Sequence, residues 1–142
     1  MNNNKTVFFA IGLLLLILGA FMLIPLIVQY IYGENNSTFL YSASVTVFIG
    51  VLLILTNLEE NKKLNLQQAF LLTTLSWVSL AFFGCLPFFL SNLNLSFVDS
   101  FFESMSGITT TGSTIIVDLD DTPKGILIWR AILQWLGGIG VI

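Results

Sequence analysis

The sequence predicts an all-α integral membrane protein made of transmembrane helices plus one re-entrant helix that is followed by an extended loop. Of the 142 residues, 56% are hydrophobic and only 9% are charged, whereas about 25% of the residues in a typical soluble protein are charged. Several apolar runs have about 20 residues, the length that crosses a bilayer as a helix. Between two of these runs lies a polar segment with room for a half-length helix. Lipid is therefore the expected solvent of most of the chain.

Four apolar segments are expected to span the membrane, and they are 7–30, 38–57, 66–90 and 125–142. The first is longer than a signal-peptide core of roughly 7–15 residues and has no small-residue cleavage site. We therefore expect a retained helix there, kinked at Pro25. Pro87 breaks the third segment near its end. The fourth is still apolar at Ile142, which suggests that the chain is a fragment.

The segment 91–122 is too polar to span lipid, but its first part predicts a short helix. Ser96 is a suitable N-terminal cap, and Asp99 stands three residues later, as in a capping box. Aromatic residues and a methionine then recur at helical spacing, and Gly107 is expected to end the helix. A helix over 97–106 is half the length needed to cross a bilayer. Between two full spans, such a helix followed by a Thr/Gly-rich strip is typical of a re-entrant loop.

The distribution of basic residues predicts the orientation in the membrane. Lys5 precedes the first span, and Lys62 and Lys63 lie between the second and third spans. Neither 33–37 nor 91–122 contains a lysine or arginine. The positive-inside rule then places the N-terminus in the cytoplasm, and the re-entrant segment enters from outside.

The Thr/Gly-rich strip after the short helix carries the clearest chemical signal, and it comprises Thr109, Thr110, Thr111, Gly112, Ser113 and Thr114. A dehydrated monovalent cation needs oxygens that replace its water shell. Stacked backbone carbonyls, helped by threonine hydroxyls, supply them without a formal charge that would trap the ion. The necessary backbone angles favour glycine, and the C-terminal end of the preceding helix adds partial negative charge. These features predict a permeation filter, although most such strings in other contexts are simple turns.

Composition excludes several other functions. The net charge is −3 and there are five Lys and Arg residues, too few for a nucleic-acid-binding surface. The absence of histidine excludes histidine metal sites and most hydrolase triads. Cys85 is the single cysteine and is expected to be a small buried hydrophobic residue. We therefore expect no enzyme, no cofactor and no nucleic-acid partner.

The segments 100–114, 125–130 and 134–140 together resemble the first pore repeat of the Trk/Ktr/HKT family of potassium transporters, and most of all its TrkH branch. These segments have the sequences SFFESMSGITTTGST, GILIWR and QWLGGIG. The resemblance is specific over 96–142. Over 1–95 the resemblance extends only to hydropathy: in that branch, too, two leading helices precede the repeat.

The resemblance implies a pore built from four non-identical repeats, each with the order helix, pore loop, helix. It divides this chain into two leading helices over 1–65 and the first pore repeat over 66–142. Four residues would form this chain's quarter of the potassium ladder: Thr110, Thr111, Gly112 and Ser113. The implied function is potassium uptake across the bacterial cytoplasmic membrane. The implied partners are K⁺, membrane lipid, the remaining repeats and a cytosolic nucleotide-binding regulatory subunit, and a homodimer stays open.

Arg130 lies within the fourth span, where a charged side chain needs a partner or a water path. It could pair with Glu103 on the short helix and brace the filter, or its side chain could reach the outer membrane interface. Both alternatives stay open at this point.

The remaining polar and small residues have simpler explanations. Gly137, Gly138 and Gly140 predict a close helix contact, and Trp129 and Trp135 predict packing or interface anchoring. An acidic turn of Asp118, Asp120 and Asp121 could concentrate cations, although a solvated turn is the simpler explanation.

Two functions compete with a potassium transporter subunit. One is a small subunit that forms a cation channel as a homotetramer, which its mass under native conditions would reveal. The other is a membrane assembly protein without an ion path, which a flux assay would reveal.

Overall fold

The computed structural model describes residues 4–34, 37–58 and 64–140, and every regular element in these ranges is helical. The elements are α1 (Lys5–Phe21), α2 (Leu23–Ile31), α3 (Ser37–Thr56), α4 (Leu66–Gly84), α5 (Leu86–Phe89), α6 (Phe97–Ile108), the short 3-10 helix η1 (Leu119–Asp121) and α7 (Lys124–Gly140). The predicted all-α fold class is confirmed.

Three stretches of the described chain are long and apolar enough to cross a membrane, and they are Lys5–Ile31, Ser37–Thr56 and Leu66–Phe89. They correspond to the first three predicted spans. The fourth appears as α7, which begins at Lys124. Its predicted last residues, 141–142, lie outside the described residues, as do Lys62 and Lys63, on which the predicted orientation partly rests.

Both interruptions of the long helices lie close to a proline. The first span is broken at Met22, between α1 and α2. Pro25 cannot donate a backbone hydrogen bond to the carbonyl of Phe21, and its ring crowds that turn. The predicted kink is therefore present, three residues before the proline. The third span breaks in the same way at Cys85, two residues before Pro87. Cys85 itself is fully buried, as expected.

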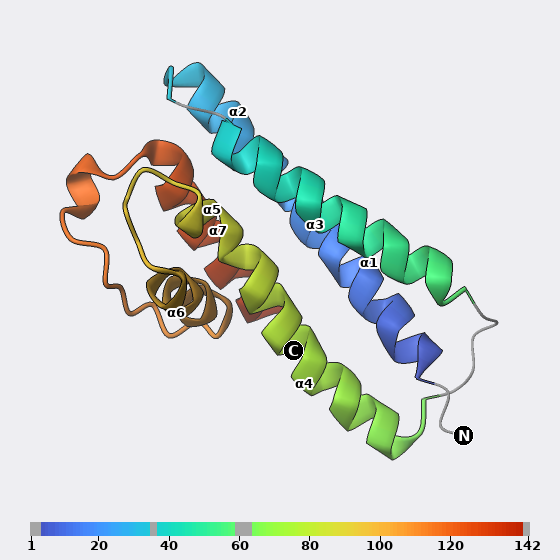
Figure 1. The fold of residues 1–142 in the computed structure, drawn as a ribbon. Helices are drawn as coiled ribbons and strands as arrows, with labels where there is room; N and C mark the ends of the chain where they lie inside the picture. Colours follow the sequence, from blue (N-terminus) through green and yellow to red (C-terminus); the bar gives the residue numbers. More distant parts are fainter. Residues whose placement is uncertain (1–3, 35–36, 59–63, 141–142) are drawn as a thin grey trace.

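The leading helices α1 and α3 run side by side (Figure 1) and meet at two glycines. A Cβ atom built on Gly12 would lie 2.9 Å from the carbonyl oxygen of Gly50, and one built on Gly50 would lie 3.0 Å from that of Gly12. The two backbones therefore touch directly, in the way that small residues permit in membranes.

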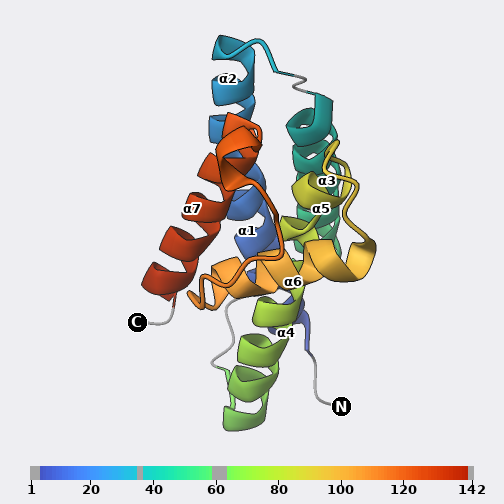
Figure 2. The ribbon, with the colours of Figure 1, turned by 90° about the vertical axis from the view of Figure 1, so that its left-hand side faces the viewer.

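The helix α6 lies across the longer helices and does not run along them (Figure 2). Its start is the predicted capping box: the Ser96 side chain accepts from the backbone N–H of Asp99, whose side chain accepts from the N–H of Ser96. Figure 1 shows that the chain reaches α6 from the end of α5 and returns to the start of α7 on the same side. The segment is therefore re-entrant.

The predicted end of this helix at Gly107 is wrong, because α6 continues through Gly107 to Ile108. Gly107 instead provides space for a neighbouring helix: its Cβ would lie 3.0 Å from Cβ of Leu133 on α7. A glycine that could end a helix in isolation serves here as a packing position inside one.

Trp129 joins three helices in the core. It is fully buried, its indole Nε1–H donates to the carbonyl of Gly84 at 3.0 Å, and its ring packs edge-on against Phe39. The buried donor is thus satisfied. Trp135 is exposed but lies edge-on to Phe21, so Trp129 and Trp135 each take part in packing.

Candidate functional site

The strip 109–115, which follows α6 directly, is exposed along its whole length. Two of its residues have positive φ angles, Gly112 at +77° and Thr110 at +59°. The first agrees with the expectation for glycine. The second was not predicted, because a β-branched residue rarely adopts this conformation. Holding Thr110 there costs about 1–3 kcal/mol, which the surrounding hydrogen bonds must offset.

Ser106 on α6 determines which way the strip faces. Its carbonyl accepts from the backbone N–H groups of Thr111 at 3.0 Å and Gly112 at 3.2 Å. No described peptide bond is cis, and in a trans peptide the C=O points opposite to the following N–H. The carbonyls of Thr110 and Thr111 therefore point away from α6, toward the exposed side.

Ser113 is held differently from its neighbours. Its carbonyl accepts from the side-chain hydroxyl of Ser106 at 2.7 Å. One of its two lone-pair positions is thus directed at α6, and the other remains available. Ser106 belongs to the motif 100–114, but the sequence alone indicates no role for it, because its contact with Ser113 arises only when the loop folds back on the helix.

Glu103 fixes the far end of the strip. Its Oε1 accepts from the hydroxyl of Thr114 at 2.5 Å and from the backbone N–H of Ile115 at 2.6 Å. Its Oε2 accepts from Nε of Arg130 on α7 at 3.0 Å. The Glu103 side chain is 0% exposed and that of Arg130 is 15% exposed. Of the two alternatives for Arg130, the structure therefore shows the ion pair.

The helix α7 forms the backing of this assembly. A Cβ atom on Gly137 would overlap the carbonyl of Ile108 at the end of α6, and Nε2 of Gln134 would lie 3.6 Å from a Cβ on Gly112. Gly138 has only one ordinary contact, at 3.9 Å, and no described residue comes within 4 Å of a Cβ on Gly140. The predicted close contact is thus confirmed at Gly137 alone.

The chemistry of the strip is that of neutral oxygens. It presents two outward carbonyls and a pair of exposed hydroxyls, those of Thr109 and Thr111, 2.9 Å apart. Within the described residues, no three His, Cys, Asp or Glu side chains are grouped so that they could hold a metal ion. Unlike a carboxylate cluster, such a row suits transient contact with a weakly held monovalent cation.

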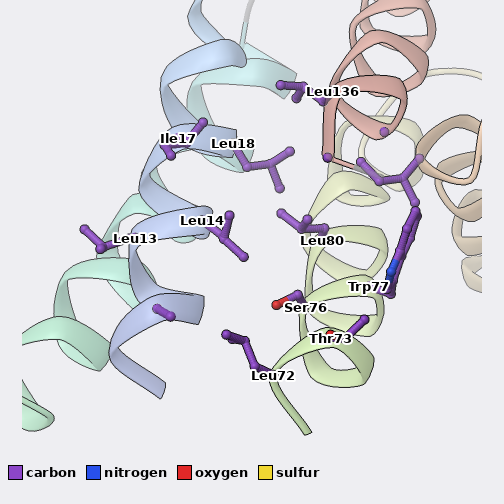
Figure 3. Close-up of a pocket in the computed structure, with 14 residues that line it drawn as sticks. Leu13, Leu14, Ile17, Leu18, Leu72, Thr73, Ser76, Trp77, Leu80 and Leu136 are labelled. Carbon is purple, nitrogen blue, oxygen red and sulfur yellow. The ribbon is translucent and has the colours of Figure 1, made fainter. Parts of the chain in front are cut away.

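The two other candidate features differ from the strip in chemistry, and the pocket adjoins its start at Ile108. Asp118, Asp120 and Asp121 are exposed in and beside η1. A pocket of about 590 Å³ lies between α1, α4 and the end of α7 (Figure 3). Its walls are mostly aliphatic, with Leu14, Leu18 and Leu80 among them, and include no ionisable group. Neither feature shares a hydrogen bond with the strip.

Comparison with known proteins gives a family match and several relatives. Residues 34–142 match the family model TrkH, described as a cation transport protein. The Trk system potassium uptake protein TrkH of Vibrio parahaemolyticus is 40% identical over 134 residues, and that of Escherichia coli K12 is 41% identical. Each alignment covers 93% of this chain and 28% of the relative. The chain therefore spans little more than a quarter of their length.

A solved structure has the same fold. The crystal structure of the potassium transporter TrkH from Vibrio parahaemolyticus superposes with a TM-score of 0.93 at 38% sequence identity. The superposition covers 99% of this chain and 30% of that one. A cation transporter of Methanocaldococcus jannaschii is 38% identical over 133 residues.

Proposed function

The chain belongs to the TrkH family of cation transport proteins, and we propose that it forms one wall of a potassium pathway across a membrane. Its contribution is the strip Thr110–Ser113, which acts as one segment of a selectivity filter. The remaining wall comes from further repeats of a full-length transporter, because this chain spans 28% of its relatives. Residues 66–142 correspond to one pore repeat, and residues 1–65 to two leading helices.

One observation carries this proposal: the backbone N–H groups of Thr111 and Gly112 both donate to Ser106. Since these bonds turn the preceding carbonyls outward, oxygens without formal charge face the exposed side. The C-terminal end of α6 lies beside them and adds partial negative charge. Irregular backbone at membrane depth is tolerated where it lines a water-filled path.

Glu103 and Arg130 support the filter from behind. The carboxylate connects the strip to α7 through charge-assisted hydrogen bonds. Both side chains lie behind the strip and do not face the path, so they hold its shape without contributing a charge to the ion site.

The names of the relatives, which are potassium uptake proteins, support uptake as the direction of transport. We propose uptake across a bacterial cytoplasmic membrane, with the N-terminus in the cytoplasm and the strip entered from outside. The transported ion is K⁺, and no catalytic step or cofactor takes part. A cytosolic nucleotide-binding regulatory subunit and a homodimer belong to the same proposal.

The test replaces Gly112 in a transporter of the relatives' full length that carries this sequence as its corresponding segment, called here the full-length transporter. Gly112→Ser forces a β-carbon onto a residue at φ +77° without a clash, since the nearest atom would be 3.6 Å away. Asn94→Ala is the control for backbone strain, because Asn94 is exposed and also has a positive φ angle, +53°. Asn94 lies in the loop before α6, outside the strip, so this variant adds strain without altering the strip itself.

We expect Gly112→Ser to lower the ratio of K⁺ to Na⁺ uptake at normal membrane abundance, in cells without their own potassium importers. Asn94→Ala is expected to leave this ratio unchanged. Thr111→Val should be milder than Gly112→Ser, because it removes an exposed hydroxyl and keeps the backbone oxygen. An unchanged ratio in Gly112→Ser at normal abundance would refute the filter assignment.

A further inference from the structure

The outer end of α7 is held by an acidic side chain from outside the pore repeat. Glu34 follows α2, and its Oε1 accepts from the backbone N–H of Lys124 at 2.7 Å. Its Oε2 accepts from the backbone N–H of Gly125 at 3.2 Å. The first N–H groups of a helix have no partner within the helix and carry partial positive charge. One carboxylate therefore caps a helix that begins 90 residues later in the chain.

A second contact sets the distance between α2 and α7 at the same place. Gln29 on α2 is 4% exposed, and a Cβ atom on Gly125 would overlap its side chain. Residue 125 must therefore lack a side chain for α2 and α7 to lie as close as they do. Figure 2 shows the start of α7 beside α2. Together, Glu34 and Gln29 set the height of α7 along its axis and its distance from α2.

The same helix then reaches α6 and the filter strip at three successive positions on one face. Arg130 bonds Glu103, Gln134 lies behind Gly112, and Gly137 touches the end of α6. These positions are spaced i, i+4 and i+7, so they form one stripe of the helix. Because a packed helix moves as a rigid rod, a shift or rotation at its first turn displaces all three contacts.

We propose that Glu34 is a positioning residue for the ion pathway: it fixes α7, and through α7 it fixes the filter strip. The leading helices would thus take part in ion selection through α7, although no described hydrogen bond joins them to the strip. This inference rests on the proposed function. A positioning role for Glu34 differs from that of a negative charge at the entrance of the pathway. Such a charge would attract K⁺ and Na⁺ equally, because both ions carry one positive charge.

The experiment uses three variants of the full-length transporter. Glu34→Ala removes both acceptors, and Glu34→Gln keeps one oxygen acceptor without the charge. Asp120→Asn removes one exposed negative charge within η1 and leaves the cap intact. For each variant we would measure membrane abundance, the ratio of K⁺ to Na⁺ uptake, and amide hydrogen exchange in a peptide that covers residues 124–125.

We expect Glu34→Ala to speed exchange at these amides and to lower the K⁺/Na⁺ ratio several-fold at matched abundance. Glu34→Gln should lie between Glu34→Ala and the unchanged protein, and it replaces Glu34→Ala if that variant does not accumulate. Asp120→Asn should change neither quantity. A purely structural role would reduce abundance and leave the ratio of the surviving transporters unchanged.

Several results would overturn the inference. Unchanged exchange would show that the cap does not protect α7, and faster exchange with an unchanged ratio would show that α7 does not transmit the change. An equal fall of the ratio in Asp120→Asn would assign the effect to charge alone. Gly112→Ser, measured in parallel, separates the two proposals. If Gly112→Ser lowers the ratio and Glu34→Ala does not, the positioning role fails and the filter stands; if neither lowers it, both fail.

Discussion

Arg130→Met should destabilise the protein more than Glu103→Gln, because the Glu103 side chain that is left unpaired in the first variant is the more deeply buried of the two. Met keeps the apolar stem but leaves the carboxylate of Glu103 inside the protein without a cation. Removing one partner of a buried ion pair typically costs about 3–5 kcal/mol. Glu103 keeps two donors, from Thr114 and Ile115, so we expect the lower end of that range, about 3 kcal/mol.

Glu103→Gln perturbs the same contact from the other side. The amide oxygen can still accept from Thr114 and Ile115, and the guanidinium that loses its partner is 15% exposed. Partial hydration lowers the cost of an unpaired charge, so we expect about 2 kcal/mol. In the double variant Glu103→Gln with Arg130→Met, neither buried charge is left alone. Its cost should therefore be about 2 kcal/mol, well below the sum of the two single costs.

The measurement is a double-mutant cycle on the full-length transporter in detergent, with the free energy of unfolding taken from denaturant titrations. Arg130→Lys is a further control, since it keeps the charge and loses the planar geometry of the guanidinium. The reasoning would be refuted if the two single costs added within about 0.5 kcal/mol, the limit for independent sites. It would also be refuted if Glu103→Gln were the more damaging of the two single changes.

Three further predictions concern the packing around the strip. Gly137→Ala should sharply lower thermal stability, because its Cβ overlaps the backbone of α6, whereas Gly138→Ala, with an ordinary contact at 3.9 Å, should melt like the unchanged protein. Ser106→Ala should cost about 1 kcal/mol of stability and should lower the K⁺/Na⁺ uptake ratio, because it frees the carbonyl of Ser113. Gln29→Met should raise the melting temperature or leave it unchanged, because the buried Oε1 of Gln29 has no partner among the described residues and an unsatisfied acceptor costs about 1–3 kcal/mol.

Features with a local physical cause were predictable from the sequence. The capping box at Ser96 depends on residues three positions apart, and the two helix breaks depend on the rings of Pro25 and Pro87. The pairing of Arg130 with Glu103 was one of two open alternatives, because an isolated charge in a span is costly. The special backbone at Gly112 followed from the residue type.

Features that depend on a distant partner were not predictable in this way. Thr110 adopts a positive φ only because the hydrogen bonds of the strip impose it, and its residue type indicates the opposite. Glu34 lies in the short segment between the first two spans, and nothing near it in the sequence indicates the helix start that it caps. The sequence predicts a helix end at Gly107 because a glycine that ends a helix and a glycine that makes room for a neighbouring helix cannot be told apart in the sequence.

The contact between Gly12 and Gly50 has a consequence for biosynthesis. Both glycines lie within the first 56 residues, so the α1–α3 hairpin can close in the bilayer before the ribosome has made α4. Backbone contact between small residues needs no later segment to complete it. α4 then packs against α1, and α4 and α7 cover α6, whose polar groups would be costly in bare lipid. The order of synthesis thus matches an order of assembly in which each segment inserts beside a surface that is already in place.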